Sequence, residues 1–241
     1  MVMQTKITLL IAGLLVSFGL SANPYASSRS DDKKVTREVS PFTEISLSVA
    51  ADLYFTQGDE FKLVLEGDDD ELEKIETTVQ GDVLKIKHNK PFSFGRTKRI
   101  KVYVTMKDVE GLTVSGSGKI EAQTAIRAED LDLSLSGSGD IIIDNLEATH
   151  VEAGISGSGD IRLAGNTTLN SLECDITGSG DIDTEGLKAA KANIDISGSG
   201  SCRVHVTGKL DADITGSGKV RYRGNPLVNA DISGSGRVES Y

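Results

Sequence analysis

Carboxylates recur directly after a glycine-rich motif, and they are the residues most able to do chemistry. The motif Ser-Gly-Ser-Gly or Thr-Gly-Ser-Gly is followed by Asp140, Asp160 and Asp181. Carboxylate oxygens are ligands that calcium prefers, but the calcium-binding β-roll repeats every nine residues with another glycine pattern. Stacked carboxylates also repel one another by about a few tenths of a kcal/mol per pair. We therefore predict no metal cofactor and retain these three aspartates as weak metal candidates only.

Glycine-rich loops can also bind phosphate, and two segments invite the comparison. A Walker loop needs a glycine, four residues and then Gly-Lys followed by Ser or Thr. Gly118-Lys119 and Gly218-Lys219 lack the upstream glycine and are followed by Ile and Val. The dinucleotide-binding fingerprint requires a helix after its glycines, and the residues that follow have a strand pattern instead. Neither nucleotide motif is present.

Acid–base catalysis by a carboxylate pair is the remaining chemical possibility, because glycan-cleaving enzymes use two such groups. Asp160 and Asp181 are an example of such a pair. The repeats are short and regular and carry no long insertions that could build a cleft. The three histidines fall in unrelated contexts, and the chain from Gly111 onward offers only Tyr222 and Tyr241 for sugar stacking. We predict no catalytic residues; a glycan lyase or hydrolase is the alternative.

A basic segment stands apart in this acidic chain. Residues 83–107 contain eight Lys and Arg and no acid, around the sequence Pro-Phe-Ser-Phe-Gly at 91–95. The pattern predicts a hairpin loop with two aromatic side chains and a basic collar. The loop could cover the end of the fold, or it could contact an anionic envelope polymer, a lipid head group or an acidic protein. The predicted contact residues are Phe92, Phe94, Arg96, Lys98 and Arg99.

An internal repeat of about twenty residues organises the second half of the chain. The Gly-Ser-Gly core occurs seven times, at spacings of 21, 20, 21, 20, 18 and 18 residues. Apolar residues alternate with polar ones on both sides of each core, which is typical of β-strands. One such unit cannot bury its apolar face alone, so stacked units must share a core. The repeat predicts an all-β, single-stranded parallel β-helix over residues 111–241.

The glycines of the repeat are predicted to form its corners. In the alternation of inward and outward residues they occupy inward positions, where a side chain would crowd a sharp bend of the backbone. The predicted corner glycines are Gly116, Gly118, Gly137, Gly139, Gly157, Gly159, Gly178, Gly180, Gly198, Gly200, Gly216, Gly218, Gly234 and Gly236. Cys174 and Cys202 fall in the two inward series on opposite sides of a corner. We expect both cysteines to be core residues without a disulfide between them.

The start of the chain predicts export. Lys6 precedes an uncharged apolar run over residues 7–20, followed by small residues, which is the order of a secretory signal peptide. We expect a signal peptide over residues 1–22, a disordered linker over 23–34 and a β-rich portion over 35–110. Removing the signal lowers the net charge from −10 to about −11, since Lys6 is lost. A charge of that sign disfavours nucleic acid as a partner.

Two further features concern the surface. Outward acids recur at two positions before the corners, and they predict either a solvated face or a surface for a cationic partner. The seventh repeat runs almost to Tyr241, which leaves no room for a polar cap over the final coil. Either the charges of Arg237 and Glu239 protect that end, or, since an exposed strand edge invites pairing, the chain forms a homo-oligomer through it.

The chain resembles a known family. The run REVSPFTEISLSVAADLYFTQGDEFKLVLEG, the later run IKVYVTMKDVEGLTVSGSGKI and the GSG repeats are similar to the putative auto-transporter adhesin, head GIN domain family, over about residues 36–240. The resemblance implies an exported bacterial protein with a right-handed parallel β-helix, a β-rich N-terminal portion and no catalytic residues. We therefore predict a non-catalytic adhesin or binding module of the cell envelope, without cofactors and with an envelope polymer or protein as partner. A purely structural envelope scaffold is a further alternative.

Overall fold

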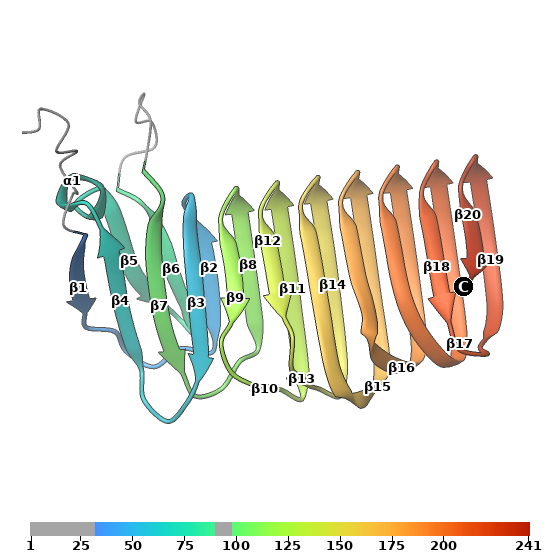
Figure 1. Ribbon diagram of the computed structural model, residues 1–241, viewed down its shortest axis with the longest axis horizontal. Helices are drawn as coiled ribbons and strands as arrows, with labels where there is room; N and C mark the ends of the chain where they lie inside the picture. The colour runs from blue at the N-terminus through green and yellow to red at the C-terminus, as the bar shows by residue number, and fades with distance from the viewer. Residues whose placement is uncertain (1–31, 90–97) are drawn as a thin grey trace, which may run out of the picture. The chain divides into compact units, whose positions relative to one another are not determined.

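The protein is a column of stacked β-coils closed at one end by antiparallel strands (Figure 1). The computed structural model describes residues 32–89 and 98–241. The expected signal peptide and most of the expected linker lie outside the described residues. Residues 31–241 form one compact unit. The first strand begins at Lys33, two residues before the expected start of the β-rich portion.

The described elements are almost all strands. The N-terminal part contains β1 (Lys33–Arg37), β2 (Glu44–Ser48), β3 (Ala51–Gln57), β4 (Lys62–Gly67), α1 (Asp69–Leu72), β5 (Ile75–Gln80), β6 (Val83–His88) and β7 (Ile100–Met106). The repeat contains β8 (Gly111–Gly116), β9 (Lys119–Ala122), β10 (Ile126–Arg127), β11 (Asp130–Gly137), β12 (Asp140–Ile143), β13 (Leu146–Glu147), β14 (His150–Gly157), β15 (Asp160–Gly178), β16 (Asp181–Gly198), β17 (Ser201–Gly216), β18 (Lys219–Arg223), β19 (Leu227–Gly234) and β20 (Arg237–Ser240).

Two main sheets face each other across the column. Sheet I contains β5, β6, β2, β8, β11 and β14, the second halves of β15 to β17, and β19. Sheet II contains β1, β4, β7, β3, β9 and β12, the first halves of β15 to β17, then β18 and β20. Every pairing within the repeat is parallel, and the predicted parallel β-helix is confirmed.

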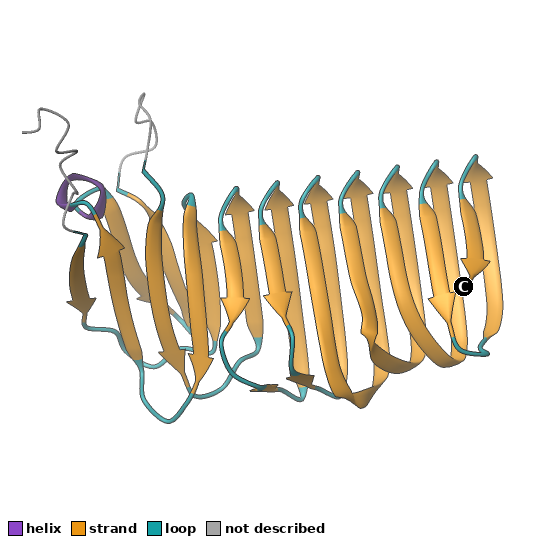
Figure 2. Ribbon diagram, in the orientation of Figure 1, coloured by secondary structure: helices purple, strands orange, loops and turns teal. Residues whose placement is uncertain are grey.

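The N-terminal part continues the same two sheets. The coil β2–β3 pairs in parallel with β8–β9, and β6–β7 stacks on its other side. Antiparallel β4 and β5 then close the end, with β1 at the outer edge of sheet II and α1 beside them (Figure 2). The chain therefore builds a cap before it winds the regular coils.

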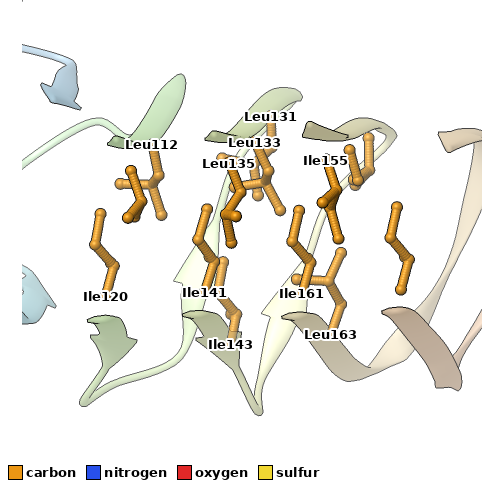
Figure 3. Packing of buried hydrophobic residues seen from close by; sticks show 14 of the residues in the cluster. Leu112, Ile120, Leu131, Leu133, Leu135, Ile141, Ile143, Ile155, Ile161 and Leu163 are labelled. Carbon is orange, nitrogen blue, oxygen red and sulfur yellow. The ribbon is translucent and has the colours of Figure 1, made fainter. Parts of the chain in front are cut away.

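A single hydrophobic core runs from the cap through the coils. Leu, Ile and Val side chains of the two sheets point toward one another, and each rung repeats the same positions (Figure 3). Leu133 pairs in register with Leu112 and Ala153, and Cys174 follows in the same inward row. Both cysteines are buried and free. Their thiols lie within hydrogen-bonding reach, and that contact together with burial raises the pKa of Cys202.

The repeated glycines lie at the corners between sheet I and sheet II, and each corner requires them for two reasons. The first glycine of every Gly-Ser-Gly core has a positive φ, from 106° at Gly116 to 139° at Gly157, which other residues rarely adopt. The second glycine packs against the coil before it: a Cβ on Gly159 would lie 2.2 Å from the carbonyl oxygen of Gly139.

That carbonyl is already used, because it accepts a hydrogen bond from the Asp160 amide at 3.1 Å. The backbone hydrogen bonds between successive coils thus continue through the corner without a break.

Candidate functional site: an acid-lined groove

Sheet I carries its acids in rows that follow the column axis. Register pairs Asp132 with Glu152, and Glu152 with Glu173. These side chains project outward from strands whose alternate residues are buried in the core, so the strand pattern itself fixes their direction. Neighbouring strands are about 4.8 Å apart, so consecutive carboxylates are close neighbours. A second row on the same face contains Asp175, Asp195, Asp213 and Asp231.

The first row borders a groove of about 670 Å³ where the strands of sheet I begin. Asp108 and Glu110 enter it from the segment before β8, and Glu129 and Asp130 from the approach to β11. Asp132, Glu152 and Glu173 complete its carboxylates, one from each of three successive coils. The groove therefore lies where irregular connections meet the regular acid row.

Few positive charges balance these acids. Arg127 lines the groove, but its Nε is 2.8 Å from Glu147 Oε2 and is engaged there. His150 also lines it, with Nδ1 2.6 Å from Ser171 Oγ. The groove is consequently a region of strong negative potential.

The electrostatics of the row agree with this description. The carboxylate of Asp132, with burial and the charge of Glu173, raises the pKa of Glu152. In the second row, burial and then the charges of Asp175 and Asp213 raise the pKa of Asp195. Raised carboxyl pKa values show that each row would be stabilised by positive charge placed beside it.

The groove changes character toward the C-terminal coils. A hollow of about 310 Å³ shares Ser171, Leu172 and Asn193 with it and adds Lys191, Lys209 and Asp211. Lys209 Nζ is 2.6 Å from Asp211 Oδ2, so one of these lysines is neutralised locally. The acid-rich part thus spans the first coils only.

The aspartates predicted as weak metal candidates do stack in register. Asp140 pairs with Asp160, and Asp160 with Asp181, while Lys119 is the neighbour on the other side of Asp140. Burial, followed by the charges of Asp181 and Asp140, raises the pKa of Asp160. Among the described residues, no group of three or more acidic, His or Cys side chains is arranged to hold a metal ion.

The predicted basic contact segment is described only in part. Phe92, Phe94 and Arg96 lie outside the described residues. Lys98 forms an ion pair with Asp68, and Arg99 Nε lies 2.7 Å from Asp52 Oδ1. Both described cations therefore have acidic partners within the chain.

Sequence reasoning found the acid rows but missed the groove. Asp108, Glu110 and Glu129 belong to connections between strands and Asp130 is the first residue of β11, and the repeat pattern gives no position for them. The available signal was the presence of acids just before two successive strands of sheet I, next to an acid row.

The fold defines an elongated parallel β-helix protein with an acid-lined groove on sheet I. The sequence profile described as "Putative auto-transporter adhesin, head GIN domain" matches residues 41–226. The chain belongs to this family, as the sequence resemblance predicted. Proteins of an adhesin family work outside the cytoplasm. No helix among the described residues is long and apolar enough to cross a membrane.

Solved structures share the fold over nearly the whole chain. A putative adhesin from Bacteroides fragilis has a TM-score of 0.80 at 24% identity, covering 87% of this chain and 97% of that one. A putative lipid binding protein from Parabacteroides distasonis has a TM-score of 0.73 at 25% identity, covering 88% and 98%. A putative adhesin from Parabacteroides merdae has a TM-score of 0.70 at 23% identity, covering 88% and 97%. Comparison with curated proteins finds no match.

Proposed function

We propose that this protein is a non-catalytic binding module of the bacterial cell envelope and that its acid-lined groove binds a cationic partner. The observation that carries the proposal is the convergence of seven carboxylates on one groove, where the one arginine among the described lining residues, Arg127, is already paired. A Lys- or Arg-rich protein segment, or a polymer bearing amines, would replace the repulsion within the row by attraction. The groove follows the column axis, so an extended partner could contact successive coils.

The alternatives differ in what they require of the same groove. A glycan-cleaving enzyme would need two of these carboxylates to act as acid and base, and the family description includes no reaction. Lipid binding, named for one relative of known structure, would bring anionic head groups against the carboxylates unless the lipid is neutral or cationic. A purely structural scaffold would bind none of these partners.

Binding of an oligolysine peptide tests the proposal, with isothermal titration calorimetry as the readout. The groove variant combines Asp132→Asn, Glu152→Gln and Glu173→Gln. The matched control combines Asp175→Asn, Asp195→Asn and Asp213→Asn, which removes the same charge from the neighbouring row. Exposed ion pairs contribute about 0.2–1 kcal/mol each, so the loss of three should weaken binding by the groove variant about 3- to 150-fold, and the control should change much less.

Equal losses in the two triple variants would show a general effect of net charge and would refute the groove as the site. Turnover of a glycan that disappears in Glu152→Gln would favour the enzyme. Binding to zwitterionic or anionic vesicles that both triple variants retain would favour the lipid alternative.

The basic segment needs a second readout, adsorption to isolated envelopes, beside oligolysine binding. We propose that Phe92 and Phe94 make a second contact, with an anionic or apolar surface of the envelope. The double variant Phe92→Ala with Phe94→Ala should leave oligolysine binding unchanged and weaken adsorption to isolated envelopes. Unchanged adsorption by a folded double variant would remove this loop from the proposal.

Export is part of the proposed function. The apolar run over residues 7–20 supports a signal peptide, and cleavage near Ala22 is expected. N-terminal sequencing of the protein recovered from the periplasm or the medium of a producing bacterium tests this. A chain that still begins at Met1 in the cytoplasmic fraction would contradict it.

A further inference from the structure

The last coil leaves core positions of the column open to solvent. Val228 and Ile232 of β19 are 41% and 40% exposed. Leu210 and Ile214, at the same register one coil earlier, are 0% and 2% exposed. Val228 and Ile232 are apolar and point toward the interior of the column, as Leu210 and Ile214 do. At β19 the hydrophobic core is therefore exposed to solvent.

The same strand also offers unpaired backbone groups. β19 pairs on one side with β17, and its other edge has no strand beside it in residues 32–89 and 98–241. In a parallel ladder, residues whose N–H and C=O bond one neighbour alternate with residues that face the other side. The Ser235 amide bonds back to Gly216, so by parity Val228, Ala230 and Ile232 direct their amides and carbonyls to the open edge.

The opposite end of the column is closed by contrast. Antiparallel β1, β4 and β5 and the helix α1 cover it (Figure 2). Arg37 donates from Nη1 to the Ile75 carbonyl at 2.7 Å and from Nη2 to the Leu72 carbonyl at 3.0 Å, which satisfies backbone acceptors at that end. β19 carries few of the devices that protect an edge: its sequence LVNADISG contains no Lys and no Pro, its register with β17 has no bulge, and Asp231 is its single charged residue.

We propose that β19 binds β19 of a second copy of this chain in antiparallel pairing, about a two-fold axis at Ala230. The pairing sets Val228 opposite Ile232 of the second copy, and Ala230 opposite Ala230. These are the residues whose backbone groups face the edge, so each pair exchanges two hydrogen bonds. The apolar side chains are then covered, as Leu210 and Ile214 are covered in the preceding coil.

The residues of β19 that point outward, Asn229 and Asp231, are complementary to the same residues of a second copy. This complementarity favours a second copy as the partner. The same axis sets Asn229 opposite Asp231 of the second copy, on both sides of the axis. One N–H of the Asn229 amide donates to Asp211 Oδ1 within the chain at 3.3 Å, so its second N–H can donate to the carboxylate of the second copy. No two carboxylates of β19 meet. A two-fold contact closes on itself, so the assembly is a dimer and not a filament.

Sedimentation velocity of residues 31–241, which form the compact unit, tests the proposal over a concentration series. The wild-type chain should pass from monomer to dimer as concentration rises. Ala230→Pro should stay monomeric, because it removes an edge-facing amide that no strand of its own chain uses. Ile232→Lys should also stay monomeric, and the matched control Ser199→Lys at a distant exposed corner should dimerise normally. Melting curves confirm that each variant is folded.

Asn229 tests the register itself. Asn229→Lys creates two symmetric charge pairs with Asp231 and should tighten the dimer by about two- to thirtyfold, while Asn229→Asp should weaken it by a similar factor. A wild-type chain that is monomeric at its solubility limit would overturn the proposal. Species larger than a dimer, or equal dimerisation of both Asn229 variants, would overturn the two-fold pairing at Ala230.

Discussion

The corner glycines give the sharpest test of how the sequence specifies the column, because the chain contains a matched pair of glycines in one coil. Gly159 is the second glycine of a corner, and Gly154 lies in the preceding strand of sheet I. A Cβ on Gly159 would lie 2.2 Å from the Gly139 oxygen and 2.6 Å from Leu135 Cδ2. A Cβ on Gly154 would meet nothing closer than the Leu133 oxygen at 3.9 Å. The two alanine variants therefore differ in the space available and not in the atoms added.

The cost of Gly159→Ala follows from these contacts. Ordinary contact distance requires the two coils to separate by about 1 Å or more, which breaks the bond from the Asp160 amide to the Gly139 carbonyl. A buried carbonyl without a partner costs about 1–3 kcal/mol, and overpacking costs about 1–3 kcal/mol. Gly159→Ala should lower the free energy of unfolding by about 2–6 kcal/mol. Gly154→Ala should change it by less than about 1 kcal/mol, in the stabilising direction.

Urea unfolding followed by circular dichroism measures both variants against the wild type. Equal transition midpoints for Gly159→Ala and Gly154→Ala would refute the close approach of successive corners. Gly157→Ala extends the series: it combines a contact of 2.2 Å with a φ of 139°, so it should be at least as destabilising as Gly159→Ala.

Three further predictions concern charge, thiols and the cap. Because the folded-state pKa of Glu152 is raised, its contribution to stability falls as the pH rises through that pKa. Glu152→Gln should therefore raise the melting temperature at pH 7, and an advantage that persisted below about pH 3, where the carboxyl is protonated in both states, would contradict this cause. Cys174 and Cys202 should resist a thiol reagent in the folded protein and give two reactive thiols in denaturant, since both are buried and free; rapid labelling of the folded protein would contradict their placement. Arg37→Ala should destabilise the protein by about 2–4 kcal/mol and speed hydrogen exchange in β1 and α1, since charged hydrogen bonds contribute about 1.5–3 kcal/mol each; exchange unchanged at the cap would contradict this role for Arg37.

The regular coils could be predicted from sequence because one residue pattern recurs in them. The alternation of apolar and polar residues predicts which side chains point into the core, and the spacing of the Gly-Ser-Gly cores predicts the length of each coil. The inward row from Leu112 to Ala230 is therefore in the structure as the pattern predicts.

The N-terminal part, β1 to β7, could not be predicted in the same way. The coil β2–β3 turns at Val49 and Ala50 without a Gly-Ser-Gly core, so it carries no repeat signal. Its pairing with β8–β9 joins residues 67 positions apart, such as Ile45 and Leu112, and no local pattern specifies such a contact. The adjacency of the two cysteine thiols was missed for a related reason, since parity predicts burial but not how closely the two sheets approach.

The site was predictable only as far as the repeat extends. Glu152 and Glu173 follow from the strand pattern, whereas Asp108 and Glu129 reach the groove from connections whose path depends on the coils around them. A groove is a property of neighbouring connections, and the sequence shows each connection alone.

Hydrogen–deuterium exchange of the folded protein with and without bound oligolysine tests the central claim most directly. Binding in the acid-lined groove predicts protection concentrated in residues 127–132, 150–152 and 171–173, and this protection should disappear in the triple groove variant. Protection centred instead on the second acid row, on sheet II or on the basic segment, with residues 127–132 unaffected, would contradict the account.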